Sequence, residues 1–480
     1  MAETKIRNAW CFGNNGYEKN GTEVERLTSV FPSKRQLEFL SMEYYNFIHF
    51  GMNTITNREW GDGSENPEIF NPKNLNTDQW CEVLKKTGSK GIIITAKHHD
   101  GFCLWNTKYT DHSVMNSPYG KDIVKQLQKS CEKYGLKMGI YLSPWDRHEK
   151  TYGTEEYNNF FVSQLKELAT QYGEIFTFWF DGACGEGKNG KKQVYDWERY
   201  YSVIRELQPN AVISICGPDV RWIGNEGGRV RKSEWSVVPA NSASNEKIMR
   251  ESQQSEAQGK KMTVIDTDED LGSRELLKGF SQLVFKPAEA DVSINYGWFH
   301  CSKPFSHARK KRSAKMLSEI YFNTVGANAS MLLNVPPDRS GRINKREIRR
   351  LEEFTRLINE PFKNKIDCEF FAEGEKQRRK IDFSKSLVFE DDDYGFSFVL
   401  EKSGEIKTVV LKEELSLSQR IEAFEVFAEI KGENKKVFEG TVIGSKRIIR
   451  LKDSLKTKKI TVVITQSRGN PAIKTAELYG

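Results

Sequence analysis

The chain has 480 residues and a mass of 55.3 kDa, more than one hydrophobic core usually holds, so its length predicts at least two domains. Hydrophobic residues make up 38% of the chain and charged residues 29%, a balance that excludes a wholly disordered protein. The net charge of +7 is too small for a nucleic-acid-binding surface, and no apolar run approaches the roughly 20 residues of a membrane-spanning helix.

From about residue 75 the sequence alternates helical and strand patterns, which is typical of βα units around a parallel sheet. Apolar residues at helical spacing predict helices over 77–88, 123–135, 161–168 and 194–209. Apolar runs predict buried strands over 91–96, 136–142, 174–180, 211–215, 261–266, 292–295 and 330–335. The strand spacing favours a (β/α)8-like barrel with long loops, and a doubly wound open sheet is the alternative.

After Pro361 the pattern changes to short alternating segments rich in Lys and Glu. These segments, at 386–389, 406–411, 424–430 and 459–464, predict an antiparallel β-sandwich. We therefore expect an α/β barrel domain over residues 1–360 and a C-terminal β-sandwich domain over residues 361–480.

Two carboxylates follow predicted strands. Asp181 comes directly after the apolar strand 174–180, and Glu226 lies in a Trp- and Gly-rich loop after strand 211–215. Because reactive groups of a barrel gather at the C-terminal ends of its strands, the two side chains are candidates to face one another. Most glycoside hydrolases need a pair of carboxyl groups for catalysis. A lone Asp at this place is as readily explained as a helix cap.

Histidines form a second group of candidates. His98 and His99 follow strand 91–96. Together with His49 and His112 they make a metal site an alternative interpretation. Adjacent strand residues point to opposite faces, and the chain contains no HxH or HExxH spacing. The pattern therefore favours hydrogen bonding to a hydroxyl-rich ligand, with no metal and no cofactor, and leaves a structural role for one of the pair open.

Five tryptophans lie in loop-like contexts rich in Gly, Asp and Asn, where a flat ring is suited to pack against a sugar ring. They are Trp60, Trp105, Trp145, Trp222 and Trp298. Loop packing explains any one of them, but together they favour a carbohydrate cleft. The densest basic run, Arg309 to Arg312, is expected to be the solvated start of a helix.

Six motifs, in order along the chain, resemble those of the α-L-fucosidases of glycoside hydrolase family 29. They are Tyr45-Asn-Phe-Ile-His49, Glu59-Trp60, Ala96-Lys-His98-His99-Asp-Gly-Phe, Tyr141-Leu-Ser-Pro-Trp145, Trp179-Phe-Asp181-Gly and the run from Asn323 to Pro337. The resemblance implies a barrel-like catalytic domain backed by a β-sandwich, and a retaining double displacement without a metal.

The resemblance also assigns roles to residues. It implies that Asp181 is the nucleophile and that Glu226 is the acid/base, because Arg221-Trp-Ile-Gly-Asn-Glu226 is similar to the segment that supplies this Glu in the branch selective for α-1,3 and α-1,4 linkages. Glu251, Glu269 and Glu289 are the alternatives for the acid/base. The implied substrate-binding residues are His49, Trp60, His98, His99, Tyr141, Trp222 and Trp298.

The expected function is that of a retaining exo-α-L-fucosidase that removes terminal α-1,3/1,4-linked fucose from branched, Lewis-type glycans. A broad-specificity fucosidase, another retaining hexosidase and a non-catalytic sugar-binding protein are the alternatives. Fucosylated oligosaccharides or glycoconjugates are the expected partners, without nucleic acid or membrane insertion, and the oligomeric state is left open. The resemblance implies a periplasmic or secreted enzyme whose leader is absent from this chain, with the cytoplasm as the alternative. The C-terminal domain has no Trp, so we expect it to brace the barrel.

Overall fold

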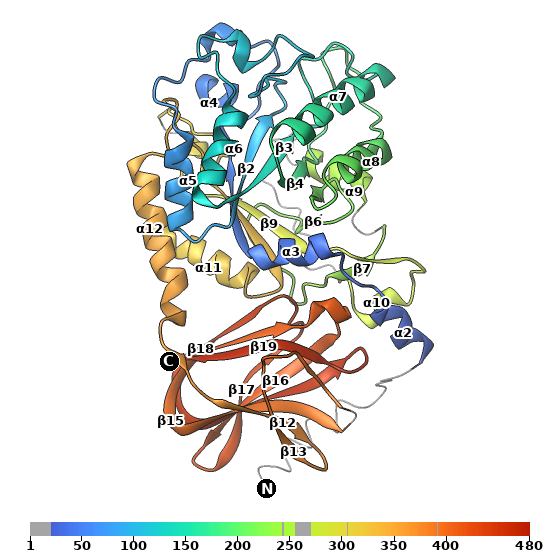
Figure 1. The fold of residues 1–480 in the computed structure, drawn as a ribbon, viewed down its shortest axis with the longest axis vertical. Coiled ribbons are helices and arrows are strands. Elements are labelled where there is room, and N and C mark those ends of the chain that lie inside the picture. The colour runs from blue at the N-terminus through green and yellow to red at the C-terminus, as the bar shows by residue number, and fades with distance from the viewer. Residues whose placement is uncertain (1–20, 242–243, 255–269, 305, 391) are drawn as a thin grey trace.

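The structure, a computed structural model, describes residues 21–241, 244–254, 270–304, 306–390 and 392–480 (Figure 1). A helix-wrapped sheet fills the upper half of the molecule in Figure 1, and strands of the C-terminal residues fill the lower half. Within the described ranges, no helix has the length and apolar character that crossing a membrane requires.

Eight parallel strands form the sheet of the upper half, in the order β5-β4-β3-β2-β1-β10-β9-β6. Their bounds are β1 Tyr44–Ile48, β2 Gly91–Lys97, β3 Lys137–Leu142, β4 Ile175–Phe180, β5 Val212–Ile215, β6 Arg221–Trp222, β9 Ala288–Ser293 and β10 Ala329–Asn334. The two ends of the sheet meet at a parallel bridge between Ser214 of β5 and Val220, the residue before β6, so the sheet curls into a nearly closed barrel. The (β/α) fold class is thereby confirmed.

Helices cover the outside of the barrel, and polar caps set where they begin. Their bounds are α2 Thr22–Thr28, α3 Lys34–Met42, α4 Met52–Thr56, α5 Thr77–Lys86, α6 Ile123–Tyr134, α7 Glu155–Gln171, α8 Trp197–Leu207, α9 Asn245–Gln254, α10 Arg274–Leu277, α11 Ala314–Thr324 and α12 Lys345–Asn359. Asn76 caps α5 and Asp122 caps α6 by accepting a hydrogen bond from a first-turn N–H. All four predicted helices are present, and α7 extends beyond its predicted range at both ends.

The predicted strands agree with the observed ones with two exceptions. The strand expected over 261–266 lies outside the described residues. The strand expected over 292–295 is the end of β9, which starts at Ala288. Arg309, Lys310 and Lys311 of the basic run are exposed, as predicted, but the run does not start a helix, because α11 begins only at Ala314. The prediction was also wrong for Arg312, which is half-buried and donates to three backbone carbonyls.

The C-terminal quarter of the chain, the lower half of the molecule in Figure 1, is antiparallel, as predicted, and has two layers. Its strands are β11 Lys365–Ile366, β12 Glu369–Gly374, β13 Arg378–Ile381, β14 Leu387–Val388, β15 Asp393–Glu413, β16 Ile421–Ile430, β17 Glu433–Gly440, β18 Arg447–Ser467 and β19 Ala472–Tyr479. The long strands β15 and β18 pair along their length, and their register breaks after Val399. The first part of β15 pairs with β12 and the last part with β19, so the two strands pass from one layer to the other. Apolar side chains such as Phe398, Val409 and Ile460 fill the space between the layers.

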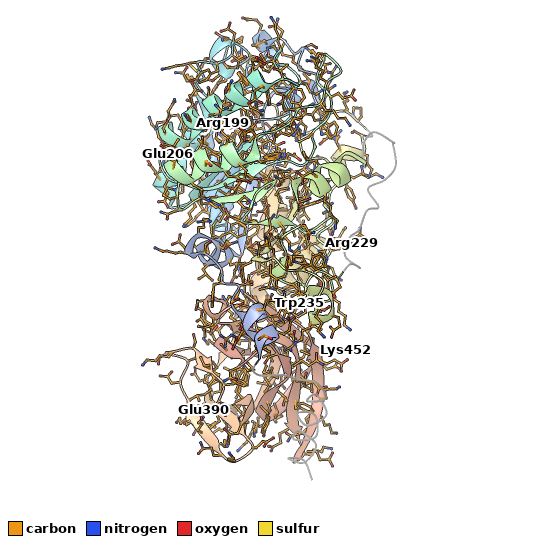
Figure 2. The ribbon with its side chains drawn as sticks, turned by 90° about the vertical axis from the view of Figure 1, so that its right-hand side faces the viewer. Arg199, Glu206, Arg229, Trp235, Glu390 and Lys452 are labelled. Atoms are coloured by element: carbon orange, nitrogen blue, oxygen red, sulfur yellow. The ribbon has the colours of Figure 1, made fainter. Side chains whose placement is uncertain are left out.

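Side chains of both halves interlock at their junction. Glu43, which follows α3, accepts hydrogen bonds from Lys412 and Lys446 at 2.7 and 2.6 Å. The guanidinium of Arg468 lies 4.4 Å from the ring of Trp235, which Figure 2 labels between the two halves. The short ribbon of β7 (Val237–Pro239) and β8 (Leu283–Phe285) lies on the barrel side of this junction.

Candidate active site

Polar and aromatic side chains gather at the C-terminal ends of the barrel strands. Parallel strands bring these ends to one rim, which is where the reactive groups of a barrel belong. The residues at or after the strand ends are His49 (β1), His98 and His99 (β2), Tyr141 (β3), Asp181 (β4), Glu226 (β6) and Trp298 (β9). The structure thus brings the candidates from six strands to one mouth.

Asp181 is held by a set of hydrogen-bond donors. The Tyr141 hydroxyl donates to Oδ2 at 2.8 Å, and the Ala183 N–H donates to Oδ1 at 2.8 Å. Burial raises the pKa of Asp181 above its ordinary value, and these hydrogen bonds, with one from the Gly182 N–H, counteract that rise. These donors therefore fix the orientation of the carboxylate and offset part of the cost of burying its charge.

His99 lies beside Asp181 with its Nε2 3.8 Å from Oδ2. Its Nδ1 is 2.7 Å from the hydroxyl of Ser143, which itself donates to the Trp145 carbonyl at 2.6 Å. Because the hydroxyl proton is used, Ser143 accepts from His99, so Nδ1 carries the ring proton. Burial lowers the pKa of His99 to about 3, so the ring is neutral and Nε2 offers a lone pair.

The other two histidines, His49 and His98, differ from each other in which ring nitrogen carries the proton. His49 Nδ1 lies 3.0 Å from the Asn334 amide oxygen and donates to it, because the Asn334 amide nitrogen donates to the Trp298 carbonyl at 2.7 Å. His98 Nδ1 instead accepts from the Asn53 amide nitrogen at 3.1 Å, so its Nε2 carries the proton. Burial lowers the pKa of both rings, so His49 and His99 present acceptors and His98 presents a donor.

Aromatic rings wall the same mouth. Trp60 is half-buried, with its ring centroid 5.4 Å from that of His99 and 5.1 Å from that of Trp145. The Trp298 ring lies 5.0 Å from His49, and Tyr141 stacks on Trp179 at 5.3 Å. Flat apolar faces beside hydrogen-bonding edges suit a sugar, which has both C–H faces and hydroxyls.

Trp105 does not belong to this wall, although the sequence placed it with the other loop tryptophans. Its side chain is fully buried, and its indole N–H donates to Glu167 on α7 at 2.9 Å. The prediction that it lines the cleft was wrong, because the partner of its indole, Glu167 on α7, lies 62 residues away in the chain.

Glu226 lies on the loop after β6. It is half-buried, and the negative charge of Asp181 acts on its carboxyl group. Burial first, and then the negative charge of Asp181, raise the pKa of Glu226 to about 7. A hydrogen bond from the Trp298 side chain and the positive charge of Arg312 limit the rise. The site therefore holds two carboxyl groups with different proton affinities, one braced by donors and one kept protonated up to neutral pH.

Two further carboxyls on β9 lie deeper in the barrel. Glu289 is fully buried and accepts hydrogen bonds from the Tyr45 hydroxyl and the Trp179 indole, so it has no access to a substrate and is not the acid/base. Asp291 accepts from the indole of Trp222 at 2.7 Å, which fixes the strand that leads to Glu226. Glu269 and the side chain of Glu251 lie outside the described residues.

Sequence reasoning missed several partners of the site. Glu59 was noted only as part of a motif, yet its carboxylate accepts from the Trp298 N–H at 2.7 Å and holds that loop in place. Arg312 was placed on a solvated face, yet it donates to the Glu226 carbonyl at 3.3 Å. In the part of the chain that the structure describes, no group of three or more His, Cys, Asp or Glu side chains is arranged to hold a metal ion.

Comparison with known proteins agrees with this geometry. The α-L-fucosidase family model matches residues 33–360, and the chain is 38% identical over 470 residues to alpha-L-fucosidase 1 of Arabidopsis thaliana, a match that covers 93% of this chain and 87% of that protein. The chain belongs to the α-L-fucosidase family of glycoside hydrolases.

Solved structures extend the likeness to the whole fold. A crystal structure of a Bacteroides ovatus protein superposes with a TM-score of 0.82 at 40% identity, over 96% of this chain and 77% of that one. A family 29 fucosidase of Ruminococcus gnavus, solved in complex with fucose, superposes with a TM-score of 0.77 at 29% identity, over 94% of this chain and 95% of that one. Both matches include the C-terminal β domain as well as the barrel.

Proposed function

We propose that this α-L-fucosidase is a retaining exo-enzyme that releases terminal α-1,3- or α-1,4-linked L-fucose from branched, Lewis-type glycans. The observation that carries the proposal is the pair of unlike carboxyls in one mouth, Asp181 braced by donors and Glu226 with its pKa raised to about 7. A nucleophile must be ionised and a general acid must be protonated, and these environments favour those two states.

The proposed reaction has two displacements. The Asp181 carboxylate attacks the anomeric carbon while the bond to the leaving oxygen breaks and Glu226 gives that oxygen its proton. Water then attacks the anomeric carbon of the fucosyl-Asp181 ester, Glu226 takes the proton of the water, and the carboxylate of Asp181 leaves. Each displacement inverts the anomeric carbon, so the two together release fucose with its configuration retained.

The neutral histidines give a physical reason for sugar recognition. Each hydroxyl both donates and accepts, so a rim that presents Nε2 lone pairs from His49 and His99 and an N–H from His98 matches neighbouring hydroxyls of one sugar. Trp60, Trp222 and Trp298 would lie against the C–H faces of the sugar and of its neighbour. The segment that ends in Glu226 supports the branched-substrate preference, and a broad-specificity α-L-fucosidase is the alternative.

Fucose release from a Lewis trisaccharide and from a linear α-1,2-fucosylated trisaccharide, measured side by side, tests this proposal. We expect fucose release from the branched sugar by the unchanged protein and none by the Asp181→Ala variant. When azide rescues Glu226→Ala we expect an α-fucosyl azide, because azide attacks the β-linked fucosyl-Asp181 ester and inverts the anomeric carbon a second time. Release mainly from the linear sugar would overturn the linkage preference, and wild-type rates for Glu226→Ala on the Lewis sugar would overturn its role as acid/base.

A further inference from the structure

Tyr296 presents an exposed aromatic ring next to the active site. It is 43% exposed, whereas every other residue in the range 291–300 is buried or half-buried. Trp298, two residues further along the chain, lies with its ring 5.0 Å from that of His49 in the sugar site. A flat ring that is left in water beside a sugar site is a surface that a further sugar can cover.

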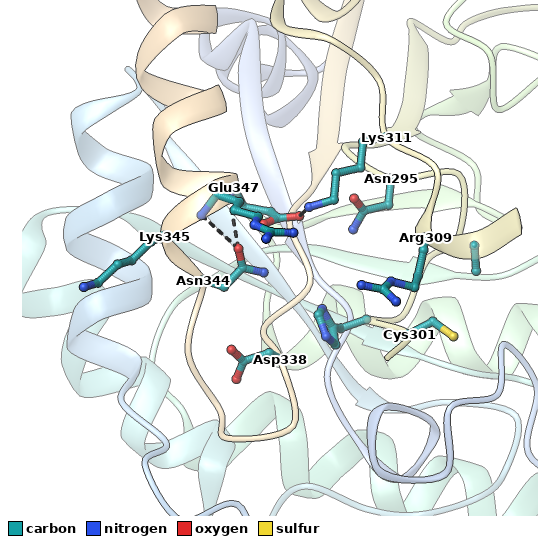
Figure 3. A pocket seen from close by; sticks show the side chains of 11 residues that line it. Asn295, Cys301, Arg309, Lys311, Asp338, Asn344, Lys345 and Glu347 are labelled. Atoms are coloured by element: carbon teal, nitrogen blue, oxygen red, sulfur yellow. Dashed lines mark hydrogen bonds and ion pairs between the residues drawn. The ribbon is translucent and has the colours of Figure 1, made fainter. Parts of the chain in front are cut away.

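A short antiparallel pairing sets the direction in which Tyr296 points. Asn295 forms a bridge with Lys311, and the N–H of Tyr296 donates to the Lys310 carbonyl at 2.8 Å. The side chains of Asn295 and Lys311 line a pocket on one face of this pairing (Figure 3). Because successive residues of an extended chain point to opposite faces, Tyr296 and Arg312 share the other face.

Arg312 links the ring of Tyr296 to the loop of Glu226. The guanidinium carbon of Arg312 lies 4.8 Å from the centroid of the Tyr296 ring, and the same group donates to the Glu226 carbonyl at 3.3 Å. Its other hydrogen bonds go to two backbone carbonyls at and just after the end of β9. The ring of His307 meets that of Tyr296 edge to face, with their centroids 5.1 Å apart. The exposed ring is therefore held in place from two sides.

The position of Glu226 indicates which part of a substrate this ring would meet. A general acid lies within hydrogen-bond reach of the leaving oxygen, because it gives that oxygen its proton. Glu226 and Trp298 are half-buried and Tyr296 is exposed, so the Tyr296 ring lies on the solvent side of this group. A terminal fucose fills the mouth, and the rest of the glycan extends from the leaving oxygen toward solvent.

We propose that the ring of Tyr296 binds the sugar from which fucose is released, by packing against the C–H face of that sugar. The proposal rests on the proposed role of Glu226 as the acid/base. It makes Tyr296 a specificity-determining residue, because a fucoside with a sugar as leaving group gains this contact and a fucoside with a small leaving group does not.

Steady-state hydrolysis of two substrates by the full chain tests the proposal. One is a Lewis trisaccharide, and the other is α-L-fucosyl fluoride, whose leaving group is a single atom. We expect Tyr296→Ala to lower the ratio of kcat/KM for the trisaccharide to kcat/KM for the fluoride about three- to tenfold, the effect of one aromatic contact. Tyr296→Phe keeps the ring and is expected to restore the ratio. Phe31→Ala removes a 57% exposed ring between α2 and α3, and as the matched control it should leave the ratio in place.

Three results would count against the proposal. An unchanged ratio in Tyr296→Ala would reject the contact, and an equal loss in Tyr296→Phe would assign the effect to the hydroxyl. An equal fall in kcat for the fluoride would also overturn it, because Glu226 is the base in the second displacement of every substrate. The ring would then only support Glu226 through Arg312. If Tyr296→Ala does not fold, Tyr296→Leu, which covers Arg312 without a flat ring, takes its place with the same expectation.

The proposed function can fail separately from this contact. No release from the Lewis trisaccharide by the unchanged protein rejects the linkage preference alone. The ratio is then measured with the linear α-1,2-fucosylated trisaccharide, which also has a sugar as its leaving group, and the same fall in Tyr296→Ala is expected. Hydrolysis of the Lewis trisaccharide with an unchanged ratio in Tyr296→Ala rejects the contact alone.

Discussion

At the scale of single residues, the environment of Glu226 sets the pH range in which the enzyme works. Burial and the charge of Asp181 raise the pKa of Glu226 to about 7, and its protonated form is the one that donates to the leaving oxygen. We therefore expect kcat/KM for a Lewis trisaccharide to fall as the pH rises through about 7. An aryl fucoside needs less protonation of its leaving group, so its kcat/KM should fall less over the same range.

Arg312 provides a variant that tests this assignment. Its positive charge lowers the pKa of Glu226, so Arg312→Met should move the basic limb of the kcat/KM profile to higher pH. Lys310→Ala removes a charge from the same basic run at an exposed position and should leave the limb in place. A basic limb that stays near pH 7 in Arg312→Met would show that another group controls it.

At the scale of elements, the connection after β1 holds the loop after β9. The carboxylate of Glu59 accepts from the N–H of Trp298, and the amide of Asn57 accepts from Ser302 at 2.7 Å. Gly297 is required beside Glu59, because a Cβ at Gly297 would lie 2.3 Å from a Glu59 oxygen. The wall of the sugar site is thus fixed by residues about 240 positions apart in the chain.

Glu59→Ala should free the loop after β9 that carries Trp298, because it removes the acceptor of the Trp298 N–H. The loss of a hydrogen bond to a charged group costs about 1.5–3 kcal/mol, which corresponds to a rise of roughly 10- to 100-fold in KM for an aryl fucoside if the loop loses its position. Glu59→Gln keeps one acceptor oxygen and should raise KM much less. Steady-state kinetics of both variants checks this expectation, and equal KM values for the two would contradict it.

The elements that sequence reasoning predicted best are those with a local signal. Strands such as β2 and β4 are continuous apolar runs because both of their faces are buried. β1 was noted only as a motif, since Asn46 interrupts its apolar run and is accommodated by donating to the Leu333 carbonyl at 2.8 Å.

The site was predictable to the extent that it follows the strand ends. Asp181 and the histidine pair stand directly after recognisable strands, and parallel pairing brings those ends together. The roles of Trp105 and Arg312 were not predictable, because each is determined by a partner far away in the chain, Glu167 for the former and the Glu226 carbonyl for the latter. Tautomers likewise depend on neighbours such as Asn53, which no spacing rule reveals.

At the scale of the whole molecule, a charged cluster ties the β domain to the barrel. Glu422 on β16 binds Arg468 at 2.8 Å and Arg274 of α10 at 2.8 Å, and its side chain is 9% exposed. Arg468 is fully buried against Trp235. Because removal of one member leaves a buried charge unpaired, Glu422→Ala should lower the free energy of unfolding by about 3–5 kcal/mol.

Tryptophan fluorescence makes this a test of coupling between the two halves. All ten tryptophans lie before residue 365, and of those that the structure describes Trp235 contacts Arg468 of the β domain, so fluorescence reports mainly on the barrel, whereas Glu422 lies in the β domain. If the halves unfold together, Glu422→Ala shifts the fluorescence transition in denaturant and the circular dichroism transition equally. Glu390→Ala, at an ion pair with Arg379 in which the Glu390 side chain is 58% exposed, is the matched control and should change stability by less than about 1 kcal/mol (Figure 2). A circular dichroism transition that moves while the fluorescence transition stays would mean that the β domain unfolds by itself and does not brace the barrel.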